Sequence, residues 1–335
     1  EAVGGGLTAT AAADLGLAPG TPVGVGIIDA HAGGLGVLGA KLEGQEVVDS
    51  AALETRLALI AGTSCCHMAS SVEPVFVPGV WGPYYSAMVP ELYLNEGGQS
   101  TAGKLLDHVT LTHGATAQLQ AIAKERGVSR YTVLDERLAE MAAEQGLPAR
   151  KLGLLTADLH VTPDFFGNRS PLADPGMRGG IIGLPLSANL DDLALLYLAT
   201  LQALAYQTKH IIDTMVENGH APIETIWVTG GLIKNRLYLQ AHADATGCTL
   251  VLPQEQEAVL LGSAVLGARA AGVFPDLPTA MSQMSSVGEL IEPYQLECAD
   301  ECDVSVPSFH ACKYKVFRKM TDDQREYRDL MATAM

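Results

Sequence analysis

The chain has 335 residues, of which 48% are hydrophobic and 18% charged, as in a globular protein with one large domain or two moderate ones. Its formal net charge of −17 at pH 7 excludes non-specific binding to nucleic acid or an anionic membrane surface, because phosphate groups repel such a chain. No stretch approaches the roughly 18 consecutive apolar residues of a membrane-spanning helix. We therefore expect a soluble, cytoplasmic protein with neither nucleic-acid nor membrane partners, unless a targeting sequence lies upstream.

The chain begins with EAVGGG, which is not an initiator sequence, so we expect a piece of a longer protein. Residues 8–15 have the pattern of a short helix that ends at a glycine. Residues 22–29 (PVGVGIID) predict a buried strand that ends in a carboxylate, and a glycine-rich helix or turn follows. Residues 55–60 predict the next strand, which runs into a turn of small residues.

The middle of the chain is mostly helical. Residues 81–90 are aromatic and interrupted by proline and glycine, which is typical of an ordered loop or hairpin. Residues 100–126 and 132–145 have helical periodicity. Residues 164–184 predict a polar loop that ends in a strand, and residues 191–218 give the strongest helix signal.

Strands and helices alternate towards the end of the chain. We expect strands at 224–229 and 249–252 and helices at 235–246 and 259–271. This alternation predicts an α/β domain, a mixed sheet flanked by helices, and its strand–Gly-Gly–helix unit resembles the nucleotide-binding half of an actin-like ATPase (ribonuclease H-like) domain. Beyond Phe274 the composition becomes polar and acidic, which indicates a linker, and residues 314–331 predict a terminal amphipathic helix.

Asp29 ends the first predicted strand beside a glycine-rich turn, a usual place for catalytic groups in α/β folds. Its carboxylate can accept the proton of a hydroxyl group or help to hold magnesium. The alternative is that Asp29 only caps the following turn, which is the commoner fate of aspartate before small residues.

Two glycine-containing turns have the composition of a phosphate or nucleotide site. Gly62, Thr63 and Ser64 offer backbone N–H groups and two hydroxyls, without matching the P-loop pattern. Gly230 and Gly231 follow a strand and precede a helix whose N-terminal dipole favours anions. Ordinary turns are the alternative for both segments.

Two further positions have open alternatives. Glu96 precedes two glycines at an expected loop-to-helix junction, where it can bind a polyol hydroxyl or simply be solvated. Gly262 belongs to a run of small residues on a helix, which permits close approach of an adenine ring or of another helix. Cys298, Cys302, His310 and Cys312 fit no common zinc spacing well, so we favour reduced thiols there.

Seven segments stand in a fixed order between residues 4 and 272: GIIDAHAGG, AGTSCCHM, FVPGVWGPYYSAMVP, NEGGQS, FFGNRSPLADPGMRG, VTGGLIKN and EAVLLGSA. In these segments and their order the sequence resembles the FGGY carbohydrate kinases, their D-ribulokinase-like branch in particular.

The resemblance implies a role for each candidate residue. Asp29 matches the catalytic base close to magnesium, and Glu96 matches an acid that contacts ribulose. The implied ATP-binding residues are the second phosphate loop, the adenosine motif and a small position on the helix beside the base: Gly62, Thr63, Ser64, Gly230, Gly231, Asn235 and Gly262. The resemblance also implies a structural, hinge-related role for Asn168, Arg169, Pro171 and Arg178.

The implied activity is ATP- and Mg²⁺-dependent phosphorylation of a pentulose hydroxyl, D-ribulose giving D-ribulose 5-phosphate. The family's first domain has no counterpart here, so residues 1–15 are expected to be its remnant or hinge, 16–272 the C-terminal ATP-binding domain, and 273–335 an acidic linker with a terminal helix. That first domain is an expected partner, and the fragment alone is expected to be inactive. The alternatives are a sibling kinase for L-ribulose, xylulose or ribitol and a non-catalytic ATP-binding scaffold, and the sequence leaves the oligomeric state open, a homodimer included.

Overall fold

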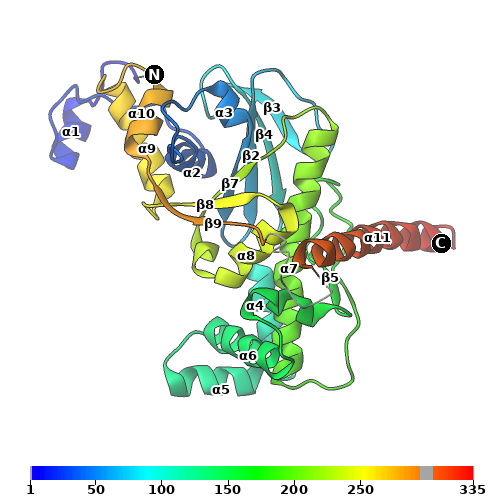
Figure 1. Cartoon of the computed structure of the whole chain (residues 1–335). Coiled ribbons are helices and arrows are strands. Elements are labelled where there is room, and N and C mark those ends of the chain that lie inside the picture. Colours follow the sequence, from blue (N-terminus) through cyan, green and yellow to red (C-terminus); the bar gives the residue numbers. More distant parts are fainter. Residues whose placement is uncertain (1, 295–304, 335) are drawn as a thin grey trace.

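The computed structural model describes residues 2–294 and 305–334 (Figure 1). Its centre is a seven-stranded sheet in the order β3-β4-β2-β1-β7-β8-β9. The neighbouring strands β1, β7 and β8 are parallel, and the other pairs are antiparallel. The strands are β1 (Arg56–Ala61), β2 (Cys65–Ser71), β3 (Trp81–Tyr85), β4 (Tyr93–Gln99), β7 (Thr225–Thr229), β8 (Thr249–Pro253) and β9 (Val287–Ile291).

Both faces of the sheet are covered because its central strands carry apolar side chains on both sides. Leu57 and Leu59 of β1 belong to a core cluster with α4 to α8, whereas Ala58 between them belongs to the cluster with α2, α9 and α10. The helices are α2 (Asp29–Leu38), α4 (Gly103–Thr112), α5 (Thr116–Arg126), α6 (Arg130–Glu144), α7 (Leu190–Glu217), α8 (Arg236–Thr246), α9 (Ala258–Ala270) and α10 (Leu277–Met284). The predicted fold class, a mixed sheet flanked by helices, is confirmed.

The remaining elements lie around this core. Figure 1 shows α4, α5 and α6 gathered at one end of the long helix α7, and α11 extending away from the sheet towards the C-terminus. Phe317 of α11 packs against Tyr206 of α7 in a small separate core. The remaining elements are α1 (Ala9–Leu15), α3 (Ser50–Glu54), η1 (Ala149–Thr156), β5 (His160–Thr162), β6 (Gly180–Ile182), η2 (Gly231–Lys234) and α11 (Val306–Ala332).

The strand predicted at residues 22–29 is wrong. The segment is extended but does not join the sheet. Among the described residues its backbone pairs with the start of the chain, where Val3 N–H donates to Val23 C=O at 2.7 Å, and Gly24 lies against the backbone of Leu266 on α9. Glycines at two alternate positions leave too little side-chain area for a buried strand. Asp29 consequently begins helix α2 rather than ending a strand.

Other elements differ from expectation in extent. The helix predicted at 100–126 is two helices, α4 and α5, separated at His113, Gly114 and Ala115. Residues 277–291, expected to be linker, form α10 and the strand β9, which pairs with β8. Cys298 and Cys302 lie outside the described residues. Within the described ranges no group of three or more His, Cys, Asp or Glu side chains is placed to hold a metal ion.

None of the helices in the described part of the chain has the length and apolar character needed to cross a membrane.

Candidate active site

The carboxyl ends of the parallel strands β1 and β7 bring the two glycine turns together. Strand β1 runs into Gly62-Thr63-Ser64, and β7, its direct neighbour, runs into Gly230. Gly230 has φ = +100°, and a side chain there would stand 2.5 Å from the carbonyl oxygen of Ala61. Only glycine fits between the two turns. The predicted phosphate loop and adenosine motif therefore lie side by side at one edge of the sheet.

The phosphate-loop candidate is a tight hairpin held by its backbone. Gly62 N–H donates to Ser64 C=O (3.0 Å), and Thr63 C=O accepts from Ala102 N–H (2.8 Å) at the start of α4. The hydroxyls of Thr63 and Ser64 make no hydrogen bond to any residue that the structure describes. The hairpin is thus fixed while both hydroxyls stay available to a ligand.

The adenosine-motif candidate combines an open glycine with a fixed asparagine. Gly231 is exposed, and no heavy atom of the described chain lies within 4 Å of the place its Cβ would take. Asn235 caps α8, because its Oδ1 accepts from Tyr238 N–H (2.9 Å), and its Nδ2 donates to the Tyr197 hydroxyl (2.6 Å). The side-chain amide therefore has a defined direction at the start of α8.

Helix α2 brings Asp29 to the same edge. Gly33, one turn into α2, lies beside Ile60 near the end of β1, whereas the carbonyl groups of Leu38 and Ala40 accept from Arg56 at the start of β1. The helix therefore runs antiparallel to β1, with its first residue at the carboxyl end of the strand. Asp29 is exposed, and the one hydrogen bond that its carboxylate accepts within the described chain comes from the adjacent Ala30 N–H (2.7 Å).

Glu96 is a buried member of strand β4 and not part of a loop-to-helix junction. Its side chain is held from two sides: Oε2 lies 3.1 Å from Nε2 of His31, and Oε1 lies 2.7 Å from Nη2 of Arg169. The hydrogen bond from His31 and the positive charge of Arg169 outweigh burial and lower the pKa of Glu96. Since His31 follows Asp29 by two residues, this contact joins Glu96 to the first turn of α2.

Arg169 is the residue of this site whose role the sequence did not reveal, because the segment around it was interpreted as structural. Its guanidinium carbon lies 4.5 Å from the ring centre of Trp81, and Nη1 lies 3.8 Å from Sγ of Cys66. A Cβ at Gly98 would stand 2.7 Å from Nε of Arg169, so this glycine makes room for the guanidinium. No spacing in the sequence connects residues 98 and 169, so this contact could not be predicted.

Gly262 has the packing role that the sequence left as an alternative. A side chain there would collide with the carbonyl group of Ala32, and one at Gly36 would collide with the carbonyl group of Ala258. These glycines let α9 and α2 pack backbone to backbone, which fixes the helix that carries Asp29. Contact of Gly262 with a nucleotide stays a prediction.

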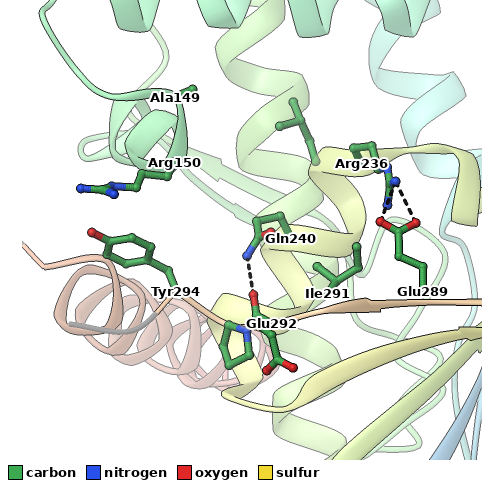
Figure 2. Close-up of a pocket in the computed structure, with 10 residues that line it drawn as sticks. Ala149, Arg150, Arg236, Gln240, Glu289, Ile291, Glu292 and Tyr294 are labelled. Atoms are coloured by element: carbon green, nitrogen blue, oxygen red, sulfur yellow. Dashed lines mark hydrogen bonds and ion pairs between the residues drawn. The ribbon is translucent and has the colours of Figure 1, made fainter. Parts of the chain in front are cut away.

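A pocket of about 560 Å³ lies between η1, α8 and β9, and its lining includes Arg236, the residue after Asn235 (Figure 2). Figure 2 shows Arg236 paired with Glu289 at 2.8 Å and Gln240 donating to the backbone carbonyl of Glu292 at 3.1 Å. None of the nine proposed catalytic, sugar-binding and ATP-binding residues lines this pocket; these are Asp29, Gly62, Thr63, Ser64, Glu96, Gly230, Gly231, Asn235 and Gly262.

Residues 57–271 match the family described as the FGGY family of carbohydrate kinases, C-terminal domain. The chain belongs to this family. It is 53% identical, over 98% of its length, to an FGGY carbohydrate kinase domain-containing protein of Danio rerio, of which it covers 58%. It is 40% identical to a D-ribulokinase of Saccharomyces cerevisiae, over 79% of this chain and 38% of that one.

Solved structures confirm the actin-like ATPase fold of this FGGY chain. A xylulose kinase from Rhodospirillum rubrum superposes with a TM-score of 0.70 at 22% identity, over 96% of this chain and 55% of that one. The chain spans 57–58% of the length of its relatives from Danio rerio, Xenopus laevis and Homo sapiens.

Proposed function

We propose that this FGGY chain forms the nucleotide-binding part of an ATP-dependent kinase that phosphorylates a hydroxyl of a pentulose, D-ribulose in the first place. The observation that carries the proposal is the convergence of Asp29, the free hydroxyls of Thr63 and Ser64, and the open Gly231 at one edge of the sheet. The choice of D-ribulose is supported by the yeast relative that bears the name D-ribulokinase.

Asp29 is the proposed general base. An exposed carboxylate that is bound only by its neighbouring N–H can accept the proton of a sugar hydroxyl while that oxygen forms its bond to phosphorus. The electron pair of the broken phosphorus–oxygen bond leaves on the departing diphosphate. A positioned base of this kind contributes about 10²–10⁴-fold to the rate.

The residues present fit ATP and magnesium. The hydroxyls of Thr63 and Ser64 can donate to phosphate oxygens, and Gly231 lets a nucleotide approach the backbone beside Asn235. When bound, ATP supplies the phosphoryl group, and Mg²⁺ offsets the charge of the phosphates. One carboxylate suffices for magnesium, since the ion commonly keeps several waters and takes its other ligands from phosphates. Asp29 is the proposed ligand.

Glu96 is proposed to accept hydrogen bonds from sugar hydroxyls. An ionised carboxylate has about four acceptor positions, and His31 and Arg169 occupy two of them. The remaining contacts of sugar and phosphate are proposed to come from a first domain, because the chain spans 57–58% of its relatives' length. Closure of two domains over the substrates would then exclude water. The cytoplasmic location and a homodimer stay predictions.

The test is a coupled assay of ADP release by this chain and by a form extended upstream of Glu1, with D-ribulose, L-ribulose, xylulose, ribitol and glycerol. We expect turnover that depends on the sugar, highest with D-ribulose, and only in the extended form. A different preferred sugar would reassign the chain to a sibling kinase. Binding of ATP without turnover on any sugar, in either form, would contradict the proposal and favour the non-catalytic scaffold.

A further inference from the structure

We propose that Arg169 is a positioning residue of the sugar site, which fixes the carboxylate of Glu96 as the acceptor of sugar hydroxyls, and that helix α11 fastens the loop that carries it. The inference rests on the proposed function. Its basis is the chain of contacts from His31 through Glu96 to Arg169 and on to the ring of Trp81.

The guanidinium has a single well-defined place. Gly98 leaves the space that it fills, the ring of Trp81 covers one of its faces, and Glu96 accepts from Nη2. Trp81 lies directly opposite Glu96 in the pairing of β3 with β4, so acid, arginine and indole form one layer on the sheet. An arginine held in this way stabilises the ionised form of the acid and restricts its rotamers at the same time.

The loop between β5 and β6 is anchored close to Arg169 on both sides. Asn168 donates to Asp164 (2.9 Å), which also accepts from Gln207 of α7 (2.9 Å). Ser170 donates to the carbonyl group of Gly79 (2.9 Å), in the connection that leads to β3. The residues before and after Arg169 are therefore tied to two different elements of the core.

Helix α11 holds the same loop from outside. Arg328 pairs with both carboxylate oxygens of Asp174 at 2.6 and 3.1 Å. Gln324 accepts from the backbone N–H of Arg178 (2.8 Å) and donates to its carbonyl group (2.5 Å). Asp174 in turn exchanges two backbone hydrogen bonds with Asn168, at 2.8 and 2.9 Å. The contacts of α11 thus reach the residue that precedes Arg169.

The pKa of Glu96 offers a measurement that would not change if Arg169 had only a structural role. The groups facing its carboxylate are His31 from α2, Arg169 from the loop and Cys66 from β2. The hydrogen bond from His31 and the charge of Arg169 lower the pKa of Glu96, so removal of Arg169 raises it. The pH below which protonation of Glu96 weakens sugar binding should therefore rise as well.

The experiment uses the extended, sugar-active form with Arg169→Met and Arg169→Lys, and Arg126→Met as the matched control. Arg126 of α5 also pairs with a carboxylate, that of Glu136 on α6 at 2.6 Å, and neither residue belongs to the candidate site. For Arg169→Met we expect the KM for sugar to rise about tenfold, which corresponds to about 1.4 kcal/mol, while the KM for ATP changes less than twofold. The acid limb of kcat/KM for sugar should move to higher pH, because the positive charge that lowers the pKa of Glu96 is removed. Arg169→Lys should return the acid limb to its wild-type position, because lysine keeps the positive charge. It should bring the KM for sugar only part of the way back to the wild-type value, because lysine lacks the planar guanidinium group.

Arg328→Ala keeps Arg169 itself and loosens its loop from outside, and it should raise the KM for sugar by a smaller factor in the same direction. The inference would be overturned if the wild type turns over sugar and Arg169→Met has the same KM for sugar and the same acid limb. It would also be overturned if Arg169→Met raises the KM for sugar and the KM for ATP by the same factor. If the wild type turns over no sugar, the proposed function fails and the inference fails with it.

Discussion

Thr208 of helix α7 lies between two buried histidines beneath the candidate site. His242 donates from Nδ1 to the carbonyl group of Tyr238 (2.8 Å), so its Nε2, at 3.2 Å from the Thr208 hydroxyl, acts as an acceptor. Nε2 of His67 lies 2.9 Å from the same hydroxyl and donates to it. Burial lowers the pKa of His67 to about 3 and that of His242 to about 4. Both rings are therefore neutral in the folded protein.

This network predicts acid sensitivity. Above the unfolded pKa of about 6.5 both histidines are neutral in either state, and as the pH falls below it only the unfolded chain takes up their protons. The free energy of unfolding should therefore fall between pH 7 and pH 4.5, by on the order of 2 kcal/mol for each histidine. Urea unfolding across this range measures it.

His242→Asn tests the assignment, because an amide can still donate to the carbonyl group of Tyr238. The variant should be less stable at pH 7 but should lose less stability on acidification than the wild type. Parallel curves for the two proteins would show that His242 does not titrate on unfolding.

Among single residues, contiguous motifs pointed to Asp29, Thr63 and Gly231, which are exposed as a ligand site requires, and their roles stay predictions. Arg169 was interpreted as structural because its contact with Glu96 joins two distant segments, and only the folded sheet brings them together.

At the scale of elements, the pair α2 and α9 decides where Asp29 lies. The two helices approach backbone to backbone through Gly36 and Gly262, so a side chain at either position would force α2 and α9 apart. The position of the proposed base therefore depends on residues that need not touch any substrate.

Gly262→Ala should destabilise the chain by at least about 2 kcal/mol, because overpacking of a well-packed contact displaces backbone. The matched control is Gly267→Ala on the same helix, where the described chain has no heavy atom within 4 Å of the new methyl group. It should stabilise the chain by about 0.5–1 kcal/mol through helix propensity. Urea unfolding of both variants measures the difference, and equal effects would contradict the packing role of Gly262.

Elements were predictable where side-chain pattern and local propensity agree. Helix α7 and strands β1, β7 and β8 follow from apolar patterns with clear ends. Strand β4 was not predicted because glutamate and two adjacent glycines disfavour strands. The strand forms nevertheless, because Ile211 and Arg169 pack onto those two glycines. Residues 22–29 were predicted as a buried strand from their apolar pattern, but only Gly24 packs closely, against Leu266 of α9, whereas Val25 and Ile28 are exposed.

At the scale of the whole molecule, the two faces of the mixed sheet serve packing, and one of its edges carries the candidate active site. Helices cover both of its faces, while the ends of β1 and β7 and the start of α2 leave one edge with available hydroxyls and an available carboxylate. This arrangement suits a site completed by a second domain. The chain spans 57–58% of its vertebrate relatives, which agrees with such a partner.

The most direct test of the proposed kinase is Asp29→Asn in the extended form, assayed for D-ribulose-dependent ADP release. Asp14→Asn, an exposed aspartate on α1, is the control. We predict a loss in kcat of about 10²–10⁴-fold for Asp29→Asn, with little change in the KM for sugar, because the amide keeps the shape and cannot take the proton. Asp14→Asn should behave as the wild type. Full sugar phosphorylation by Asp29→Asn would contradict the assignment of Asp29 as the base.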